Sequence, residues 1–141
     1  MIAVIPCGGS KLRYAARAVN LYTGTYFRAN RAYALSLVPI NRLFILSARH
    51  GLIPSDRWLE PYEQTFNRPG HVERSRLREQ VRELGLKQEE AIILGGRLYH
   101  DAIRGLFARE RFVVDQIIPR LPGAGIGYQI QWLKAHRGQL P

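Results

Sequence analysis

The segment between residues 47 and 63 carries the densest set of side chains that could do chemistry. Ser47, Arg49 and His50 follow an apolar run directly, in the order Ser-Ala-Arg-His-Gly. A polar run at this place has no folding need, and His50 could act as an acid/base group or donate to a base edge. Glu60 and Glu63 could position a water or accept a proton. We therefore expect His50, Glu60 and Glu63 to be catalytic and Ser47 and Arg49 to bind substrate.

Two aromatic residues lie among these polar positions. Trp58 and Tyr62 could stack on a nucleobase, because every base offers a π face to an aromatic ring. The alternative is that the rings belong to the hydrophobic core and that the carboxylates pair with arginines. For Tyr62 both interpretations stay open, and we expect either Tyr22 or Tyr62 to stack on the base.

The sequence PCGGSK follows the first apolar run. Gly8 lets a ligand approach the backbone, and Ser10 and Lys11 could donate hydrogen bonds to an anion or a nucleobase. A tight turn with an exposed lysine is the alternative. Cys7 could be a nucleophile or a small buried residue. The segment is neither a Walker A motif nor a GxGxxG fingerprint, so no ATP, NAD or other cofactor is expected.

Three further glycine-containing segments supply candidate binding residues. Tyr22, Thr23 and Gly24 precede a helix that Thr25 could cap. A glutamine amide in the first turn of a helix could hydrogen bond to a base edge. The remaining candidates are Gly95, Gly96 and Tyr99 in one segment, and Gly127 and Gln129 in the other.

Apolar and helical patterns alternate along the chain. Four short apolar runs predict strands buried on both faces, at Ile2–Ile5, Leu43–Leu46, Ala91–Leu94 and Phe112–Ile118. Helices are predicted at Tyr26–Leu37, Val72–Leu84, Arg97–Phe107 and Ile126–Ala135. This order predicts one α/β domain over residues 1–141, with a mostly parallel sheet of about four strands and helices on both faces. Each strand is followed by a candidate segment, the last over residues 122–129, so we expect one shared site at the carboxyl edge.

The charge balance favours an anionic partner. The chain has 21 Lys+Arg against 11 Asp+Glu, a net charge of +10, and 18 of the basic residues are arginine. Arginine's planar fork suits phosphate, and such an excess is typical of nucleic-acid-binding domains. The alternative is a genome that uses arginine wherever a surface charge is needed. The run Arg74, Arg76, Arg78 and Arg82 is most simply a solvated helix face.

Composition also excludes several classes of protein. With 141 residues, 46% of them apolar, the chain suits one folded domain. No apolar run approaches the ~20 residues that span a bilayer, and no signal peptide is evident, so we expect a cytoplasmic protein. A single cysteine excludes an internal disulfide and a cysteine-rich zinc site. The histidines show no metal-ligand spacing, and no metal is expected.

Six ordered motifs resemble those of a family of small bacterial and phage proteins that is a domain of unknown function. They are PCGGSKL, LYTGTYFR, ILSARHGLI, LEPYEQTF, LGGRLY and GAGIGYQIQWL, and they cover nearly the whole chain. A more distant similarity is to the YaaA peroxide-stress family, carried by Tyr22-Thr23-Gly24, Ser47–Leu52, Pro54, Asp56 and Pro61-Tyr62. That similarity implies DNA binding and protection from oxidative damage, although Arg49-His50 depart from the YaaA pattern. The Pro-Cys-x-x-Ser-Lys element is similar to the core domain of archaeosine synthase, a tRNA base-modifying enzyme, and both similarities point to nucleobases in nucleic acid.

Three functional hypotheses follow. In the first, an enzyme binds the backbone of DNA or RNA and either cleaves an N-glycosidic bond or modifies a base. Lys11 and His50 would stabilise negative charge on the leaving base, and Glu60 or Glu63 would position water. The second is an enzyme acting on a free nucleotide, nucleoside or modified base, with no salt-sensitive affinity for polynucleotide. The third is a DNA-binding stress-protection protein without chemistry, which predicts salt-dependent binding that pocket variants leave unchanged.

Overall fold

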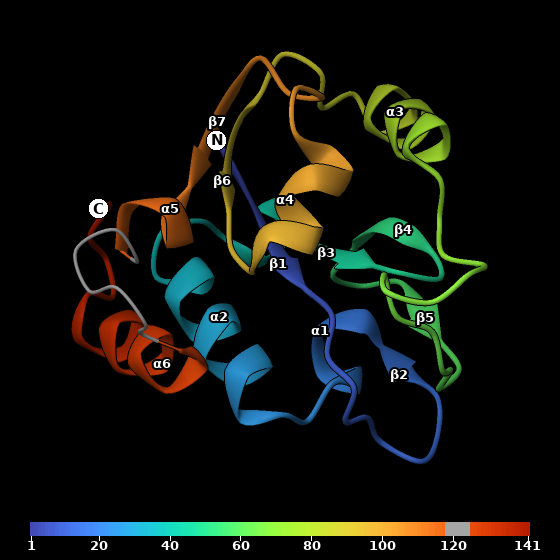
Figure 1. Cartoon of the computed structure of the whole chain (residues 1–141), viewed down its shortest axis with the longest axis horizontal. Helices are drawn as coiled ribbons and strands as arrows, with labels where there is room; N and C mark the ends of the chain where they lie inside the picture. Colours follow the sequence, from blue (N-terminus) through green and yellow to red (C-terminus); the bar gives the residue numbers. More distant parts are fainter. Residues whose placement is uncertain (118–124) are drawn as a thin grey trace.

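The main sheet has the strand order β4-β3-β1-β6-β7, and all of its pairings are parallel except that of β3 with β4. Its strands are β1 (Ile2–Pro6), β3 (Leu43–Ser47), β4 (Gly51–Pro54), β6 (Glu90–Ile93) and β7 (Arg109–Phe112). A second sheet pairs β2 (Ala16–Arg17) with β5 (Trp58–Leu59) in antiparallel fashion. The computed structural model describes residues 1–117 and 125–141, and it confirms the predicted α/β class with a mostly parallel sheet (Figure 1).

Helices cover both faces of the main sheet, as predicted. One face packs against α1 (Ala18–Leu21), α2 (Thr25–Leu35), α5 (Val113–Ile117) and α6 (Ile126–Ala135). The other packs against α3 (Arg74–Glu83) and α4 (Arg97–Ile103). Successive side chains of a strand point to opposite faces, so Ala3 and Ile5 of β1 join the first core and Ile2 and Val4 join the second. A short 3-10 helix, η1 (Ile40–Arg42), leads into β3.

The fourth predicted strand is placed wrongly. The structure has strand β7 at Arg109–Phe112 and helix α5 at Val113–Ile117, and Ile118 lies outside the described residues. β7 ends the strand order as an edge strand, and its exposed arginines alternate with less exposed positions, so it lacks an apolar run. The apolar residues that follow β7 form helix α5 instead. Its buried residues Val113, Val114 and Ile117 share one helix face.

The four predicted helices are all present, with two corrections at their ends. The N-cap of α2 is Gly24, not Thr25, because the carbonyl of Gly24 accepts the first helical hydrogen bond from the N–H of Arg28 at 3.0 Å. Helix α4 ends at Ile103, before Gly105 at φ +83°. None of the helices in residues 1–117 and 125–141 is both long and apolar enough to cross a bilayer.

Strand β4 was not predicted. A side chain of helix α3, which packs on one face of the sheet, holds the hairpin that β4 forms with β3. Gly51 begins β4 at φ +78°, a conformation that glycine adopts without strain. The buried Gln80 of α3 donates to the carbonyl oxygen of His50 at 2.8 Å and accepts from the N–H of Leu52 at 2.9 Å. A β-carbon on Gly51 would lie 2.1 Å from Oε1 of Gln80, so the turn and α3 fit only with glycine at this position.

Candidate active site

The loops after β1 and β6 meet at the carboxyl edge of the sheet. β1 lies between β3 and β6, so the next strand of the main sheet, β3, lies on one side of β1 and the later strand β6 lies on the other. Open parallel sheets bind ligands at such a point, beyond the carboxyl ends of the strands. The N–H of Cys7 donates to the carbonyl of Leu46 at 3.0 Å. Gly95 has φ +103°, and a β-carbon there would lie 3.0 Å from the ring of Pro6. This close approach brings two of the predicted binding segments together.

Three side-chain hydroxyl groups near this edge of the sheet are hydrogen bonded in series. Tyr62 lies 2.7 Å from Ser47 and 2.5 Å from Tyr22, measured between the hydroxyl oxygens. The oxygen of Ser47 also accepts hydrogen bonds from the N–H groups of Arg49 at 3.2 Å and His50 at 3.1 Å. Because these two donors occupy both lone pairs of the oxygen, the Ser47 hydroxyl must donate to Tyr62. The network thus fixes the turn after β3 to the ring of Tyr62.

The two tyrosines of this network are core residues as well. Tyr22 is 1% exposed and Tyr62 is 8% exposed. Burial raises the pKa of both phenols well above the usual value, so both keep their protons at neutral pH. The structure therefore places both rings in the core, and stacking of a base on Tyr22 or Tyr62 stays a prediction.

Lys11 covers the exposed side of this network. Its ammonium nitrogen lies 4.5 Å from the ring centre of Tyr62 and 5.6 Å from that of Tyr22. Its hydrogen-bond partner within the described chain is the carbonyl of Gly9, at 3.3 Å. Burial lowers the pKa of Lys11, although Cys7 and Glu63 nearby act in the opposite direction. The half-buried amine is thus held over an aromatic surface without a direct ion pair in that part of the chain.

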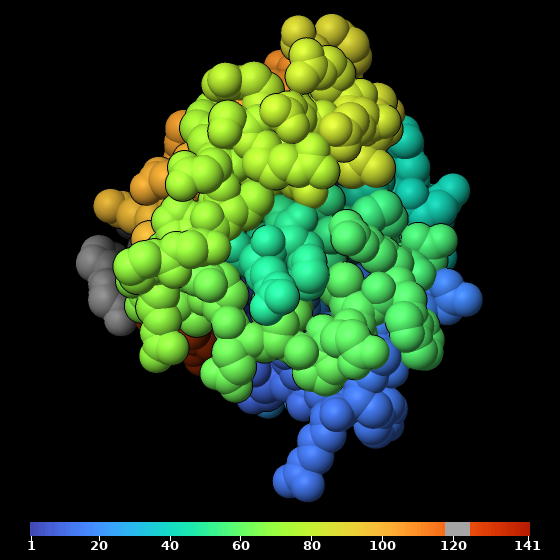
Figure 2. All heavy atoms as spheres, turned by 90° about the vertical axis from the view of Figure 1, so that its right-hand side faces the viewer, coloured from blue at the N-terminus to red at the C-terminus, as the bar shows by residue number. Residues whose placement is uncertain are grey.

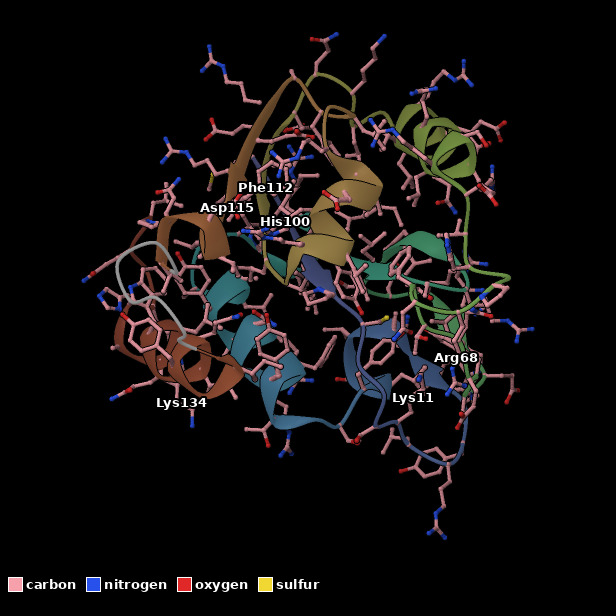
Figure 3. All side chains as sticks on the ribbon, in the orientation of Figure 1. Lys11, Arg68, His100, Phe112, Asp115 and Lys134 are labelled. Atoms are coloured by element: carbon pink, nitrogen blue, oxygen red, sulfur yellow. The ribbon has the colours of Figure 1, made fainter. Side chains whose placement is uncertain are left out.

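Two adjoining hollows open beside Lys11. The first, of about 90 Å³, also brings Cys7, Gly8, Glu63 and Tyr99 together, with Gly9, Gln64 and Thr65. The second, of about 300 Å³, is lined by Gly9, Lys11, Leu12, Pro61, Tyr62 and Glu63. Amine, carboxylate, thiol and phenol therefore share one place, and Figure 3 shows Lys11 at this end of the molecule. Gln64 and Thr65 were missed, although they continue the polar segment that begins at Glu60.

Cys7 and Tyr99 form the wall of the first hollow towards β6. The hydroxyl of Tyr99 lies 3.6 Å from the sulfur of Cys7 and donates to the Cys7 carbonyl at 3.3 Å. The Tyr99 ring meets Phe66 edge to face, with 5.2 Å between ring centres. Burial raises the pKa of the Tyr99 phenol, with a further contribution from Cys7. Tyr99 therefore joins the first α4 turn to the loop after β1.

His50, in the turn between β3 and β4, lies against the ring of Tyr62. Its ring meets that of Tyr62 edge to face, with 5.0 Å between centres. Burial lowers the pKa of His50, and the positive charges of Arg57 and Arg49 lower it further. The imidazole is therefore neutral at pH 7. Figure 2 shows the face that carries this turn, with the segment of residues 55–70 gathered around it and the blue segment between β1 and β2 projecting below.

Several predicted residues lie outside the cluster around Lys11, by which we mean the residues that line the two hollows beside it. Glu60 is exposed and does not line either of these hollows, and Trp58 of β5 is 65% exposed. Ser10 and Thr23 are exposed, and the N–H of Thr23 donates to the Ser10 carbonyl at 3.0 Å. Gly24 serves as the N-cap of α2, and Gly127 is exposed on α6.

A larger hollow lies between α4, α5 and α6. It has a volume of about 540 Å³ and is lined by Gly96, Arg97, Asp101, Arg104, Val114, Asp115 and Gln129. Gln129 accepts a hydrogen bond from the hydroxyl of Tyr26 at 2.6 Å, so its amide is tied to α2. Gly96 and Gln129 thus belong to a different hollow from Lys11. Residues 122–124 of the fourth predicted loop lie outside the described residues.

His100 is a buried histidine behind this larger hollow that the sequence did not single out. It is 1% exposed, its ring is tilted against that of Phe112 with 4.6 Å between centres, and its Nδ1 atom lies 3.6 Å from Asp115 (Figure 3). Within the described part of the chain, neither ring nitrogen has a hydrogen-bond partner. No group of three potential metal ligands occurs there either. No sequence spacing marks His100, because its burial depends on how α4 packs against β7.

The half-buried His50 and the buried His100 are expected to make stability depend on pH. Burial lowers the pKa of His50 and His100 in the folded chain, whereas the unfolded chain binds protons near pH 6.5. The unfolded state therefore holds more protons below that pH, and the free energy of unfolding should fall as the pH drops below about 6.5. Urea unfolding at several pH values should show a shallower fall for His100→Phe than for the wild type. An identical fall in both proteins would mean that His100 does not resist protonation.

A family model matches residues 2–135, from the start of β1 to the end of α6. The chain belongs to DUF6884, a family of unknown function. The match confirms the predicted membership of an uncharacterised family, and the DUF6884 region includes every residue of the cluster around Lys11. Neither the curated proteins nor the solved structures compared with the chain gave a significant match.

Proposed function

We propose that this protein is an enzyme that handles a nucleobase in DNA or RNA, either by cleaving its N-glycosidic bond or by modifying it. The observation that carries the proposal is the hollow at the carboxyl edge, where Lys11, Glu63 and Cys7 face one another. Hydroxyl groups and aromatic rings support these residues from below. Such a mixture of one amine, one carboxylate and aromatic walls suits a flat, polar ligand.

Glycosidic cleavage gives each residue a definite task. Negative charge develops on the base as it leaves, and the amine of Lys11 is placed to stabilise it. Glu63 lines both hollows and would position the attacking water. The neutral His50 lies behind Tyr62 and would hold the ring that supports the amine. Glu60 lines neither of these hollows, so Glu63 is the better placed of the two carboxylates.

Arginines near the hollow, which form no ion pair with another described residue, would bind the phosphate backbone. Arg49 and Arg57 lie close enough to His50 to lower its pKa, and both are exposed. Arg68 is also exposed, and its carbonyl lies 3.5 Å from the amide nitrogen of Gln64, a residue of the hollow. The ion pairs between described residues involve Arg42, Arg76, Arg104 and Arg111 instead. The arginines near the site are therefore available to an anionic partner.

A salt titration of oligonucleotide binding tests the proposal. Single- and double-stranded DNA and RNA oligomers are compared, some carrying uracil, an oxidised base or an abasic position. Binding that weakens steeply with salt and prefers one lesion supports a base-handling enzyme, and product analysis on that oligomer should show loss of activity in Lys11→Ala and His50→Ala. Equal binding to all oligomers, without products, would indicate a protein that only binds DNA. No binding at moderate salt would contradict the proposal and favour a free nucleotide or base as substrate.

Removing one phosphate-binding arginine should change the salt dependence. Each phosphate contact contributes about −0.9 to the slope of log K against log salt for duplex DNA. Arg49→Gln should therefore make the slope less negative by about 1, and should do so for every duplex sequence. Arg76→Gln is the matched control, because Arg76 on α3 already pairs with Glu79 and Glu83 at 3.1 Å. Equal effects of the two variants would place the DNA elsewhere.

A further inference from the structure

We propose that Lys11 is a nucleophile that forms an imine with the aldehyde of an abasic sugar in DNA. This inference rests on the proposed function and narrows it, because an enzyme that removes a base leaves such a sugar in its own site. It adds a second activity, cleavage of the strand at the abasic position. The geometry behind it is a half-buried primary amine that shares a hollow with one carboxylate and one thiol.

A comparison of the primary amines of the chain singles out Lys11. The amino group of Met1 pairs with Glu89 at 3.1 Å, at the opposite end of β1 from the hollow. Lys134 is exposed on α6, and Figure 3 shows it well apart from Lys11. Lys87 is exposed and borders a hollow that also contains two arginines and no carboxylate. Lys11 is therefore the amine that shares a hollow with a carboxylate and, among the described residues, is not already ion-paired.

The surroundings of Lys11 suit a nucleophile more than a structural cation. Lys11 forms no ion pair with any residue in 1–117 or 125–141. Its hydrogen bond to the Gly9 carbonyl is long, at 3.3 Å. The tyrosine rings beneath it restrict the direction of the side chain. Burial lowers the pKa of Lys11, which increases the fraction of neutral amine that can attack a carbonyl carbon.

The reaction balances without a cofactor. The lone pair of the Lys11 amine attacks C1′ of the ring-opened sugar. The carbonyl oxygen takes up two protons, one from the attacking nitrogen and one from solvent, and leaves as water, which gives an iminium ion. Glu63 then removes a proton from C2′, the C3′–O bond breaks, and the DNA fragment on the 3′ side leaves with a 5′-phosphate. Water finally hydrolyses the imine, which releases the unsaturated aldehyde and regenerates the amine.

Reduction with borohydride tests this step directly. The full-length protein is mixed with a duplex that carries one abasic site, and borohydride converts any imine into a stable amine that links protein and DNA. We expect a covalent adduct whose proteolytic peptide maps to Lys11. Lys11→Arg keeps the positive charge and should form no adduct, whereas Lys87→Arg and Lys134→Arg should trap as much DNA as the wild type. Circular dichroism shows whether each variant is folded, and Lys11→Gln serves as a second variant.

A tetrahydrofuran analogue, which has no aldehyde, separates binding from chemistry. If Lys11→Arg binds the analogue within about threefold of the wild type and yet traps no DNA, the loss is chemical and the proposal is supported. An adduct that maps to Met1, Lys87 or Lys134 would overturn it. Binding of the analogue by the wild type without any trapping would also overturn it while leaving the proposed function standing. The proposed function itself fails separately, if no oligomer is bound and no base is released.

Discussion

A Gly51→Ala variant is expected to lose about 3 kcal/mol of its free energy of unfolding. The positive φ of Gly51 costs a residue with a side chain about 1 kcal/mol. The larger part comes from Gln80, whose Oε1 atom would lie 2.1 Å from the new methyl group. Gln80 can move only by giving up its two hydrogen bonds to the turn, which leaves the buried N–H of Leu52 without a partner. Urea unfolding measures the loss.

Gly85→Ala is the matched control for this experiment. Gly85 has a similar φ of +70°, but a β-carbon there meets no atom within 4 Å. Its substitution should cost only the backbone strain, about 1 kcal/mol. A double variant with Gln80→Ala should reduce the cost of Gly51→Ala to that same level, because the side chain that obstructs the methyl group is gone. Equal costs at Gly51 and Gly85 in the wild-type background would show that Gln80 does not clamp the turn.

Replacing Ser47 with alanine is the second change with a large expected effect. Ser47 is completely buried, and its hydroxyl serves the N–H groups of Arg49 and His50 as well as the phenol of Tyr62. Without it, the two N–H groups lose this acceptor and Tyr62 keeps only its hydrogen bond to Tyr22, so the free energy of unfolding should fall by about 2 kcal/mol. The ring of Tyr62 also loses its anchor beneath Lys11, so any base-releasing activity should decline with it.

Two further variants separate the network from ordinary burial. Ser55→Ala removes a buried hydroxyl that donates to the Leu43 carbonyl at 2.5 Å, outside the site, and should cost about 1 kcal/mol without changing activity. Tyr62→Phe should couple to Ser47→Ala, so that the double variant loses less stability than the sum of the single losses. Strict additivity of the two would mean that the hydroxyl of Tyr62 gains nothing from Ser47.

The candidate site was predicted in part from the loops that follow the strands. Cys7, Lys11, Glu63 and Tyr99 come from three separate segments, and the structure places them in one hollow. Cys7, Lys11 and Tyr99 could be anticipated because the parallel strands β1 and β6 end at the same edge, whereas Glu63 follows β5 of the second sheet and reaches the hollow through tertiary packing. Glu60 was not placed there, because a polar residue in an irregular segment can face either the site or solvent. The assignment of Gln129 to a second hollow depends on the packing of α6 against α2.

The elements that were missed share a physical cause. β4 follows a polar turn and contains one glycine and one proline, so its local sequence favours a loop, and its pairing with β3 comes from burial of Leu52 and Ile53. β7 is an edge strand that keeps two arginines in solvent, so it shows no apolar run. In both cases long-range pairing outweighs local preference.

By itself the sequence determined the α/β class, the three central strands β1, β3 and β6 and the helices α2, α3, α4 and α6. Burial on both faces requires apolar runs, and burial on one face requires an amphipathic period. It also determined the excess positive charge, which is a property of composition. Only the tertiary structure decided that Ser47, Tyr62 and Tyr22 form one hydroxyl chain, that Lys11 lies over it, and that His100 is buried without a partner among the described residues. Those facts depend on distances between segments far apart in the chain, which packing fixes and which no local pattern encodes.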